Sequence, residues 1–358
     1  MDGLTRVEPA RPATIDADAL AGACRRILEA VGTPAETAEI VARSLTAADL
    51  RGVSSHGVSR LPAYLRRVQA GLIKPAAEPQ VVAQTPATVT LDAGAGFGHA
   101  VGWHAMGLAM ELAATQGVGV AAVRNSTHFG IAGFFAERAA AGGMVGIATS
   151  NGAALMAPPG TRTRVLGTNP LAIAIPSADD QPVVLDMATS TAALGKILLA
   201  RDAGSPIPDG WALDLEGTPT TDAAIAAAGL LTPLGGHKGF GLALALEVLS
   251  AGLSGAAAGP NAGSMYRTWD RPENLGHWFL AVDPGAFAGL DPFLTTVAEL
   301  AAAVHGAEAV AGGQPALLPG EIERRREAQA RQEGLPVTPV MAASLEEAAT
   351  LAGLESPW

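Results

Sequence analysis

Residues 171–187, LAIAIPSADDQPVVLDM, decide which kind of sheet this chain builds. Two apolar runs, Leu171–Pro176 and Val183–Met187, flank the polar segment Ser177–Gln181. Two apolar runs joined by a short polar turn are typical of a β-hairpin, whose strands are antiparallel. The stretch therefore predicts a mixed sheet.

On either side of this hairpin, the pattern alternates between strands and helices. We expect further strands at residues 88–92, 119–124, 145–150 and 276–284, and helices that end near Gln116 and Ala141. The intervening loop, 151–170, is dense in Gly, Pro and Asn, and such long loops often hold ligands. Further helices are expected at 16–30, 33–50, 61–70 and after residue 291. Thr33 and Glu36 indicate a capping box, and Phe240–Leu253 predicts a buried helix.

Length and composition limit the classes of protein to consider. The 358 residues suffice for two domains of the usual size of about 100–200 residues. A net charge of −11 argues against nucleic acid as a partner, and the single cysteine, Cys24, fits a reducing cytosol. Residues 1–18 lack the apolar core of a signal peptide, and the most apolar stretch is shorter than the about 20 residues that span a bilayer. We therefore expect a cytoplasmic protein that does not enter a membrane.

The segment Leu50–Pro75 places Ser55, His56 and Arg60 at the start of a helix. An imidazole has an ordinary pKa near working pH, so His56 is a candidate proton donor. The planar guanidinium of Arg60 matches a carboxylate in a bidentate way. This trio predicts a site for a small 2-oxo or 2-hydroxy acid.

Two further positions carry candidate chemistry. His128, in NSTHFG, follows a strand and precedes a helix, which makes it a candidate general acid or a packed histidine. Asp186 ends an apolar strand, where an uncompensated charge is costly. Its carboxylate could orient an imidazole, hold a ribose hydroxyl, or cap the next turn through Thr189 or Ser190.

Several common motifs are missing. Gly94, Gly96 and Gly98 do not have the spacing of the dinucleotide fingerprint, and the sequence has no Walker loop, nucleophile elbow or H-E-x-x-H pair. Lys238 lies at a predicted helix N-terminus, which attracts anions and suits a pyrophosphate, and the same reasoning applies to Gly320. An ordinary Rossmann half is therefore not expected.

Nine ordered motifs are similar to those of the malate/L-lactate dehydrogenase family, which is distinct from the Rossmann-type enzymes. They are SSHGVSRLPAYLRRVQAGLIKP, NSTHFG, LGTNPLA, LDMATS, GWALDLEGTPTTD, LGGHKGFGLAL, GSMY, GHWFLAVDP and LPGE. The resemblance implies an α/β fold with a non-Rossmann NAD(P)-binding domain, residues 87–290, around a mostly antiparallel sheet. It also implies a helical domain built from both chain ends, residues 1–86 and 291–358, and a homodimer.

The resemblance assigns roles residue by residue. One or the other of the residues that match His56 and His128 has been assigned the proton transfer in members of the family, and we rank His56 first, with Ser55 beside it. Arg60 matches the residue that binds the substrate carboxylate. The positions implied in contact with NAD or NADP are Asp186, Met187, Ala188, His237, Lys238, Gly320 and Glu321, while Asn151, Thr168 and Asn169 are expected to shape the same cleft.

This chain departs from the family pattern at two places. Ser54 stands where many relatives have Asp, and Pro159-Gly160-Thr161 replaces a more usual aromatic-Gly-Gly turn. Both departures bear on substrate or cofactor fit.

The expected reaction moves a hydride between a nicotinamide cofactor and C2 of a small 2-oxo or 2-hydroxy acid such as malate, lactate or sulfolactate. One alternative is an imine reductase that acts on piperideine- or pyrroline-2-carboxylate. An alternative of another class is a non-catalytic protein that binds organic anions. No metal site is expected, and neither a nucleophile motif nor a metal cluster supports a hydrolase.

Overall fold

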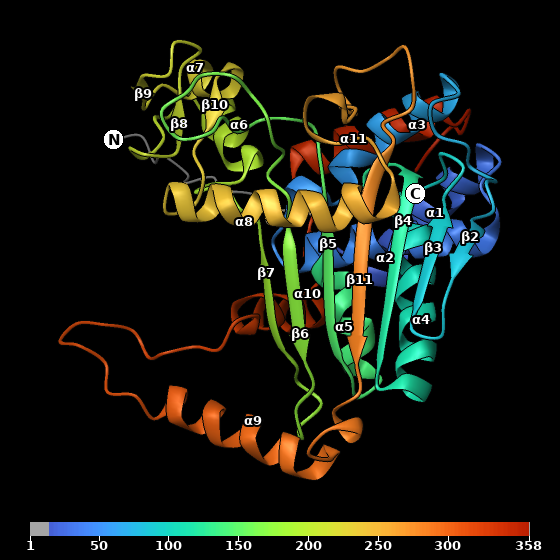
Figure 1. Cartoon of the computed structure of the whole chain (residues 1–358). Coiled ribbons are helices and arrows are strands. Elements are labelled where there is room, and N and C mark those ends of the chain that lie inside the picture. Colours follow the sequence, from blue (N-terminus) through green and yellow to red (C-terminus); the bar gives the residue numbers. More distant parts are fainter. Residues whose placement is uncertain (1–13, 358) are drawn as a thin grey trace, which may run out of the picture.

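The computed structural model describes residues 14–357 (Figure 1). The expectation about a signal peptide falls largely on residues 1–13, which lie outside the described part. The helices are α1 (Ala17–Ala30), α2 (Ala35–Leu50), α3 (Leu61–Gln69), α4 (Gly98–Gln116), α5 (Gly133–Ala141), α6 (Leu194–Asp202), α7 (Ala223–Ala228), α8 (His237–Glu247), α9 (Leu290–His305), α10 (Glu321–Glu333) and α11 (Pro339–Leu351). The strands are β1 (Thr14–Ile15), β2 (Gln80–Gln84), β3 (Thr88–Asp92), β4 (Val118–Ser126), β5 (Val145–Ser150), β6 (Leu171–Ile175), β7 (Val183–Met187), β8 (Ala212–Leu213), β9 (Pro219–Thr220), β10 (Leu230–Leu231), β11 (Leu275–Val282) and β12 (Leu335–Pro336).

Among the described residues, the main sheet has seven strands in the order β2-β3-β4-β11-β5-β6-β7. Only β3 and β4 run parallel, and every other neighbouring pair is antiparallel. The predicted hairpin is present as β6 and β7, in the register Ile173 to Leu185. The predicted mixed α/β fold around a mostly antiparallel sheet is therefore confirmed.

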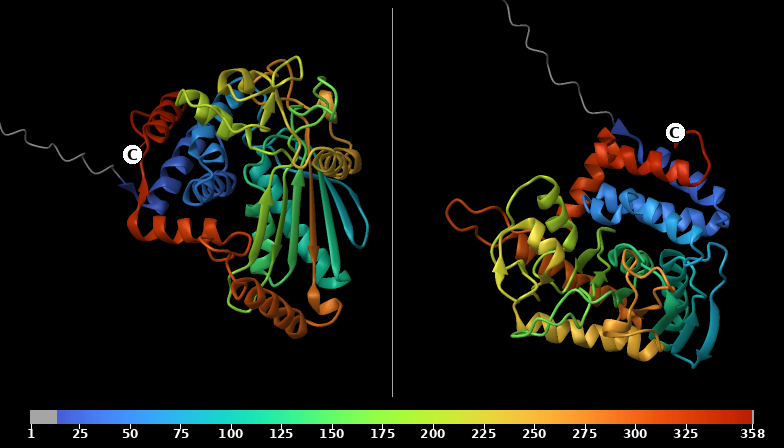
Figure 2. Two further views of the ribbon diagram at one scale, coloured as in Figure 1. Left: turned by 90° about the vertical axis from the view of Figure 1, so that its left-hand side faces the viewer. Right: turned by 90° about the horizontal axis from the view of Figure 1, so that it is seen from above.

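Helices cover the two faces of this sheet unequally. α4 packs on β4 and β11, and α5 packs on β5 and β6, so both lie on one face. The side view in Figure 2 shows this layer of helices behind the strands, while most of the other face has no helical cover. α8 crosses that second face at one end of the strands, and α9 lies beyond the other end (Figure 1).

Both ends of the described chain meet in the helical layer. Thr14 of β1 pairs with Pro336 of β12, and helices α1, α2, α3 and α11 share one apolar core. The fully buried members of this core include Leu20, Leu45 and Leu345. A helical unit made from both chain ends is thus confirmed, whereas its boundaries at residues 86 and 291 stay a prediction.

A smaller unit lies between β7 and α8 in the sequence. The two-residue strands β8, β9 and β10 form a second sheet, and α6 and α7 pack beside it. Its apolar core contains Met156, Ile197 and Leu231. Strands of two residues have no measurable periodicity, so the sequence does not reveal this sheet.

Two predictions of local structure were wrong. The capping box is absent, because Pro34 is the N-cap of α2 and the buried Thr33 hydroxyl has no hydrogen-bond partner. The helix predicted to be buried at 240–253 exposes Leu244, Val248 and Leu253 by 48%, 55% and 58%. An apolar composition does not distinguish a helix in the core from one at an uncovered surface. Across residues 14–357, no helix is both long and apolar enough to cross a membrane.

Candidate active site

Two short 3-10 turns, Ser54–His56 and Val58–Arg60, connect α2 to α3. The carboxylate of Asp49 anchors them, since its Oδ2 accepts the backbone N–H of Val58 at 2.8 Å. A Cβ at Gly57 would lie 2.2 Å from the carboxylate atoms of Asp49, so only glycine fits there. Burial raises the pKa of Asp49 to about 6, against hydrogen bonds from Val58 and Ser54. Asp49, which sequence reasoning missed, thus shapes the loop that carries His56.

The structure brings the two candidate histidines together. The rings of His56 and His128 are stacked with centroids 5.4 Å apart, and both side chains are half-buried. His128 follows β4, whereas His56 precedes α3, so the pair joins the sheet to the helical layer. Both imidazoles therefore border the same partly accessible space.

Each imidazole has a hydroxyl partner at Nδ1. The Tyr64 hydroxyl lies 2.7 Å from Nδ1 of His128, and the Ser55 hydroxyl lies 3.0 Å from Nδ1 of His56. Engagement of Nδ1 fixes the ring orientation and leaves Nε2 for a ligand. Tyr64 was missed from the sequence, although it follows Arg60 by four residues and so shares its helix face.

Arg60 lies at the start of α3 beside this pair. Its Nε donates to the carbonyl of Ser55, and this hydrogen bond does not use the two terminal nitrogens. The guanidinium carbon lies 5.3 Å from the ring centroid of Tyr266. A flat cation held in this way can bind a carboxylate through a two-pronged contact.

Burial keeps the imidazoles of this region neutral. Desolvation, and then the charge of Arg60, lower the pKa of His56 to about 3. Desolvation and the neighbouring His56 and Arg60 also hold the pKa of His128 well below its ordinary value. Behind them, His99 is fully buried, and neither of its ring nitrogens has a hydrogen-bond partner. The imidazoles of the free protein are therefore uncharged at neutral pH.

Asp186 lies one residue before the end of β7, and its hydrogen-bond partner was not predicted. Its Oδ2 accepts the backbone N–H of Gly133 at the start of α5, at 2.8 Å. The hydroxyls of Thr189 and Ser190 donate instead to the carbonyls of Thr168 and Ala192, so the capping interpretation was wrong. Although the residue reaches the surface, desolvation by the surrounding protein raises the pKa of its carboxylate to about 6.

Asn151 and Asn169 are buried and face inward. Glu247 of α8 accepts a hydrogen bond from each amide, at 2.9 Å from Asn151 and 2.7 Å from Asn169. Thr168 accepts twice from Thr189 through its carbonyl. The two amides therefore tie the end of β5 and the start of β6 to α8.

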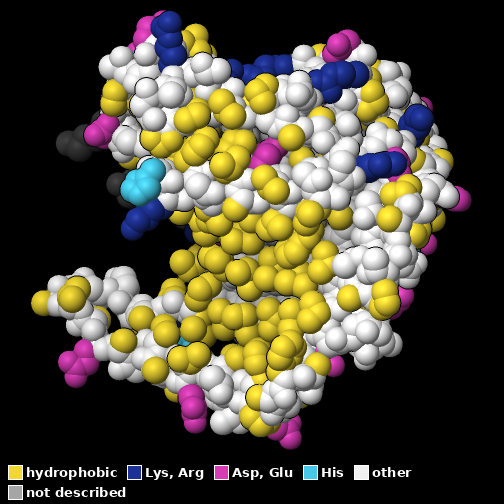
Figure 3. Space-filling view, viewed as in Figure 1, with side chains coloured by type: hydrophobic (Ala, Val, Ile, Leu, Met, Phe, Trp, Pro, Cys, Tyr) yellow, Lys and Arg dark blue, Asp and Glu magenta, His cyan; other side chains and the backbone are white. Residues whose placement is uncertain are grey.

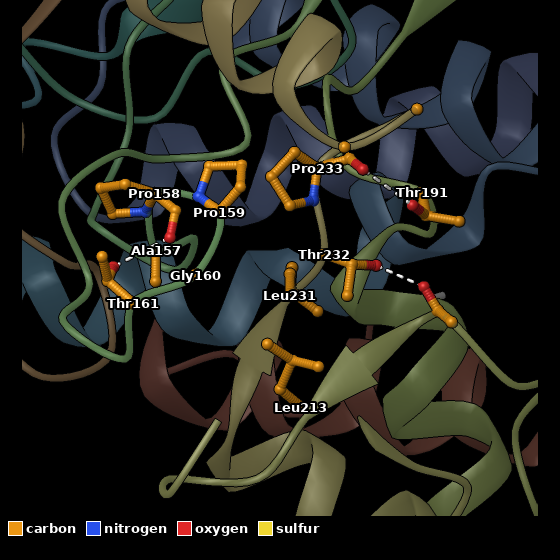
Figure 4. A pocket seen from close by; sticks show the side chains of 13 residues that line it. Ala157, Pro158, Pro159, Gly160, Thr161, Thr191, Leu213, Leu231, Thr232 and Pro233 are labelled. Atoms are coloured by element: carbon orange, nitrogen blue, oxygen red, sulfur yellow. Dashed lines mark hydrogen bonds between the residues drawn. The ribbon is translucent and has the colours of Figure 1, made fainter. Parts of the chain in front are cut away.

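A cavity of about 340 Å³ lies between the loop after β5 and the N-terminus of α8 (Figure 4). Its lining residues are Ala157, Pro158, Pro159, Gly160, Thr161, Thr191, Gly210, Leu213, Leu231, Thr232, Pro233, Gly235 and Gly236. Figure 4 shows Pro158, Pro159 and Pro233 around the opening, with Leu213 and Leu231 below them. Four residues beyond Thr191, Gly195 packs against Ser55, so one segment connects this cavity to the imidazole pair.

The remaining candidates for cofactor contact lie at two helix starts. His237 and Lys238 are exposed in the first turn of α8, directly after Gly236 in the cavity wall. Gly320 packs against Val184 of β7, two residues before Asp186. Glu321 follows it, and its Oε1 lies 2.6 Å from Nε2 of His305.

Within residues 14–357, no group of three or more His, Cys, Asp or Glu side chains could hold a metal ion. The available chemistry therefore consists of an anion-binding arginine, two neutral imidazoles and a cavity beside a helix N-terminus.

The chain is similar to known proteins over most of its length. The family model for malate/L-lactate dehydrogenase matches residues 15–346. The L-sulfolactate dehydrogenase of Methanocaldococcus jannaschii is 40% identical over 331 residues, which cover 92% of this chain and 94% of that protein. A solved structure of the sulfolactate dehydrogenase from that organism has a TM-score of 0.89 at 38% identity, and covers 96% of this chain and 98% of the other.

Two other relatives indicate the range of activities among similar proteins. The (2R)-3-sulfolactate dehydrogenase (NADP(+)) of Chromohalobacter salexigens is 40% identical over 307 residues, 86% of this chain and 89% of its own. The Delta(1)-pyrroline-2-carboxylate reductase of Ancylobacter novellus is 34% identical over 328 residues, 90% and 94% of the two chains. The prediction of an oxidoreductase, rather than of a non-catalytic anion-binding protein, is therefore confirmed. This chain belongs to the malate/L-lactate dehydrogenase family.

Proposed function

We propose that this protein transfers a hydride between a nicotinamide cofactor and C2 of a small 2-oxo or 2-hydroxy acid of the malate, lactate or sulfolactate type. The convergence of Arg60 with the stacked His56 and His128 supports this function most strongly. Arg60 holds the substrate carboxylate, and an imidazole beside it exchanges a proton with the C2 oxygen. A positioned general acid or base contributes about 10²–10⁴-fold to the rate.

We assign the proton transfer to His128, although the sequence analysis ranks His56 first for this role. The Tyr64 hydroxyl at Nδ1 of His128 is itself buried, with 1% exposure, so water does not compete for that bond. Ser55 at His56 is only half-buried, so water can compete for the corresponding hydrogen bond of His56. His56 then serves to orient the substrate.

The chain has a suitable place for the cofactor. The first-turn N–H groups of α8, with Lys238 beside them, suit a pyrophosphate, and the cavity with its proline and leucine walls suits the adenosine end. Asp186, Met187 and Ala188 continue from β7 toward Thr191 in that cavity wall. Gly320 and Glu321 complete the set next to β7. When bound, NAD or NADP supplies or accepts the hydride.

A turnover screen tests this proposal. Cofactor absorbance is followed with NADH and NADPH against 2-oxo acids, including oxaloacetate, pyruvate and sulfopyruvate. Arg60→Lys keeps the charge but loses the two-pronged fork, so KM for the acid should rise at least tenfold. Arg66→Lys, at an exposed ion pair, is the matched control and should not change KM. A lack of turnover with every acid would reject the proposal.

Reduction of pyrroline- or piperideine-2-carboxylate is the second candidate, since one relative is named for that reaction. The same site serves both substrates, because each combines a carboxylate with a polar C2 bond that accepts hydride. Turnover on the cyclic imines that exceeds turnover on every 2-oxo acid would favour this candidate.

We also propose that the protein is a homodimer. Figure 3 shows a broad apolar surface between α8 and α9, over the uncovered face of the sheet. Leu171, Ile173 and Ile175 of β6 are half-exposed there, and α9 has no buried residue. Apolar patches of this kind are rare on monomers, and a second copy is the partner the family resemblance suggests.

The single, buried Cys24 supports a cytoplasmic location.

A further inference from the structure

His277 of β11 is a fully buried imidazole that the proposed reaction does not use. It lies in the motif GHWFLAVDP, and its ring packs among the apolar rings of Phe129 and Phe279, at centroid distances of 4.6 and 6.3 Å. An apolar side chain would fill this position without hydrogen-bond partners, whereas a buried imidazole needs them. The partners of His277 therefore indicate what its polar ring does.

Both ring nitrogens of His277 have a serine hydroxyl as partner. Nδ1 lies 2.8 Å from Oγ of Ser150, and Nε2 lies 2.7 Å from Oγ of Ser126. Ser150 ends β5 and Ser126 ends β4, and these two strands flank β11 in the sheet. The imidazole therefore bridges the ends of both neighbouring strands, and both serines are buried with it.

The backbone around Ser150 indicates which ring nitrogen carries the proton. The Ser150 hydroxyl has one hydrogen, and the carbonyl of Asn151 accepts it at 2.7 Å. Oγ of Ser150 can then only accept from the ring, so Nδ1 of His277 carries the N–H. Nε2 is bare and accepts the hydroxyl of Ser126. Burial lowers the pKa of His277 to about 3, which agrees with a neutral ring.

The ring of His277 contacts the segment of His128 on both sides. Ser126 precedes His128 by two residues and donates to Nε2. Phe129 follows His128 directly, and its ring stacks on the imidazole of His277 with an interplanar angle of 11°. Two contacts of different kinds thus hold the chain before and after the residue to which we assign the proton transfer.

We infer that His277 is a positioning residue that fixes residues 126–129, and with this segment the imidazole of His128, against the sheet. This inference rests on the proposed role of His128 in proton transfer. The Tyr64 hydroxyl orients the His128 ring, and His277 fixes the backbone that carries it. Misplacement of a reacting group by 1 Å costs on the order of 10²-fold in rate, so loss of the contact with Ser126 should lower kcat.

The double variant Ser126→Ala with His277→Phe separates positioning from stability. It removes the hydrogen bond but keeps an aromatic ring against Phe129, and Ser150 still donates to the carbonyl of Asn151. No polar side chain of the bridge is then left without a partner. We expect a kcat at least tenfold below wild type, with KM for the cofactor and Tm close to wild type. A wild-type kcat in the double variant would overturn the inference.

Ser44→Ala is the matched control. Ser44 is 1% exposed and packs against Gly130, two residues after His128, but within residues 14–357 its hydroxyl has no hydrogen-bond partner. This variant should keep the wild-type kcat. A loss as large as that of the double variant would attribute the effect to packing near His128 and would overturn the inference.

His128→Asn identifies which proposal fails. In its background, the double change at Ser126 and His277 should not lower kcat further. A wild-type kcat for His128→Asn would reject the proposed function of His128. A large loss in His128→Asn combined with a wild-type kcat in the double variant would reject only the role of His277.

If the double variant does not fold, Ser126→Ala alone decides, since it removes one oxygen atom and introduces no clash. It should lower kcat at least tenfold at an unchanged KM for the cofactor, and a wild-type kcat would overturn the inference. Nitrogen-15 NMR of the wild-type imidazoles adds a spectroscopic test. His277 should carry its proton on Nδ1 throughout pH 5.5 to 7, and a ring that gains a second proton in this range would contradict the bridge.

Discussion

Tyr64→Phe removes one hydroxyl and keeps the ring that packs against Phe97 and His99, at centroid distances of 6.3 and 5.3 Å. The lost contact is the 2.7 Å hydrogen bond to Nδ1 of His128. A buried polar atom left without its partner costs about 1–3 kcal/mol. At about 1.4 kcal/mol per factor of ten, this cost predicts a loss of roughly 5- to 150-fold in kcat if it falls on the transition state.

The assay is steady-state turnover of the best 2-oxo acid, with cofactor affinity measured by fluorescence titration. The affinity should not change, because no ligand contact is removed. Tyr266→Phe is the matched control: Tyr266 is the other of the two tyrosines in the sequence, is 52% exposed, and keeps its ring over Arg60 when changed to Phe. A kcat within twofold of wild type for Tyr64→Phe would refute the orienting role of the hydroxyl.

Four more outcomes are expected. Burial holds the pKa of His56 and His128 far below 6.5, so both imidazoles are neutral from pH 5.5 to 7. Over this range kcat/KM for oxidation of the hydroxy acid, which needs a neutral base, should be flat, and kcat/KM for reduction, which needs a protonated acid, should fall about tenfold per pH unit. A transition near pH 6.5 in the oxidation profile would contradict the neutral pair. His128→Asn should lower kcat by about 10²–10⁴-fold and by more than His56→Asn does, and the opposite order in a turnover assay would return the proton transfer to His56. Lys238→Ala should weaken cofactor binding by roughly tenfold in a fluorescence titration, whereas Lys74→Ala, at another exposed lysine, should not; equal effects would remove Lys238 from the cofactor site. Sedimentation velocity should give twice the 36.0 kDa chain mass for the wild type and for Val81→Glu on the exposed strand β2, but one chain mass for Val248→Glu, directly after α8. An intact dimer in the Val248 variant would place the interface elsewhere.

Much of the sheet could be predicted from local sequence. β3 and β5 have the predicted bounds, and the antiparallel hairpin at β6 and β7 follows from apolar runs joined by a short polar turn. β2 was missed because all of its residues, Gln80–Gln84, are exposed, so its sequence lacks the alternation of a half-buried strand. The exposure of residues 240–253 was missed because an exposed apolar helix and a buried one can have the same composition.

The site could be predicted in part. The polar turn before α3 identifies Ser55, His56 and Arg60, and the position of His128 between a strand and a helix identifies His128. The residues that position this group are not evident from the sequence, because their contacts are nonlocal: Tyr64 reaches a histidine 64 residues away. His277 reaches Ser126 through the pairing of β11 with β4.

A crystal structure of the protein with cofactor and a non-reactive 2-oxo acid analogue such as oxamate tests the central claim most directly. The account predicts that both carboxylate oxygens contact the guanidinium of Arg60. It also predicts that the oxygen at C2 lies about 2.6–3.2 Å from the Nε2 atom of His128. An analogue bound with its carboxylate away from Arg60, or with neither His128 nor His56 in reach of that oxygen, would contradict the account.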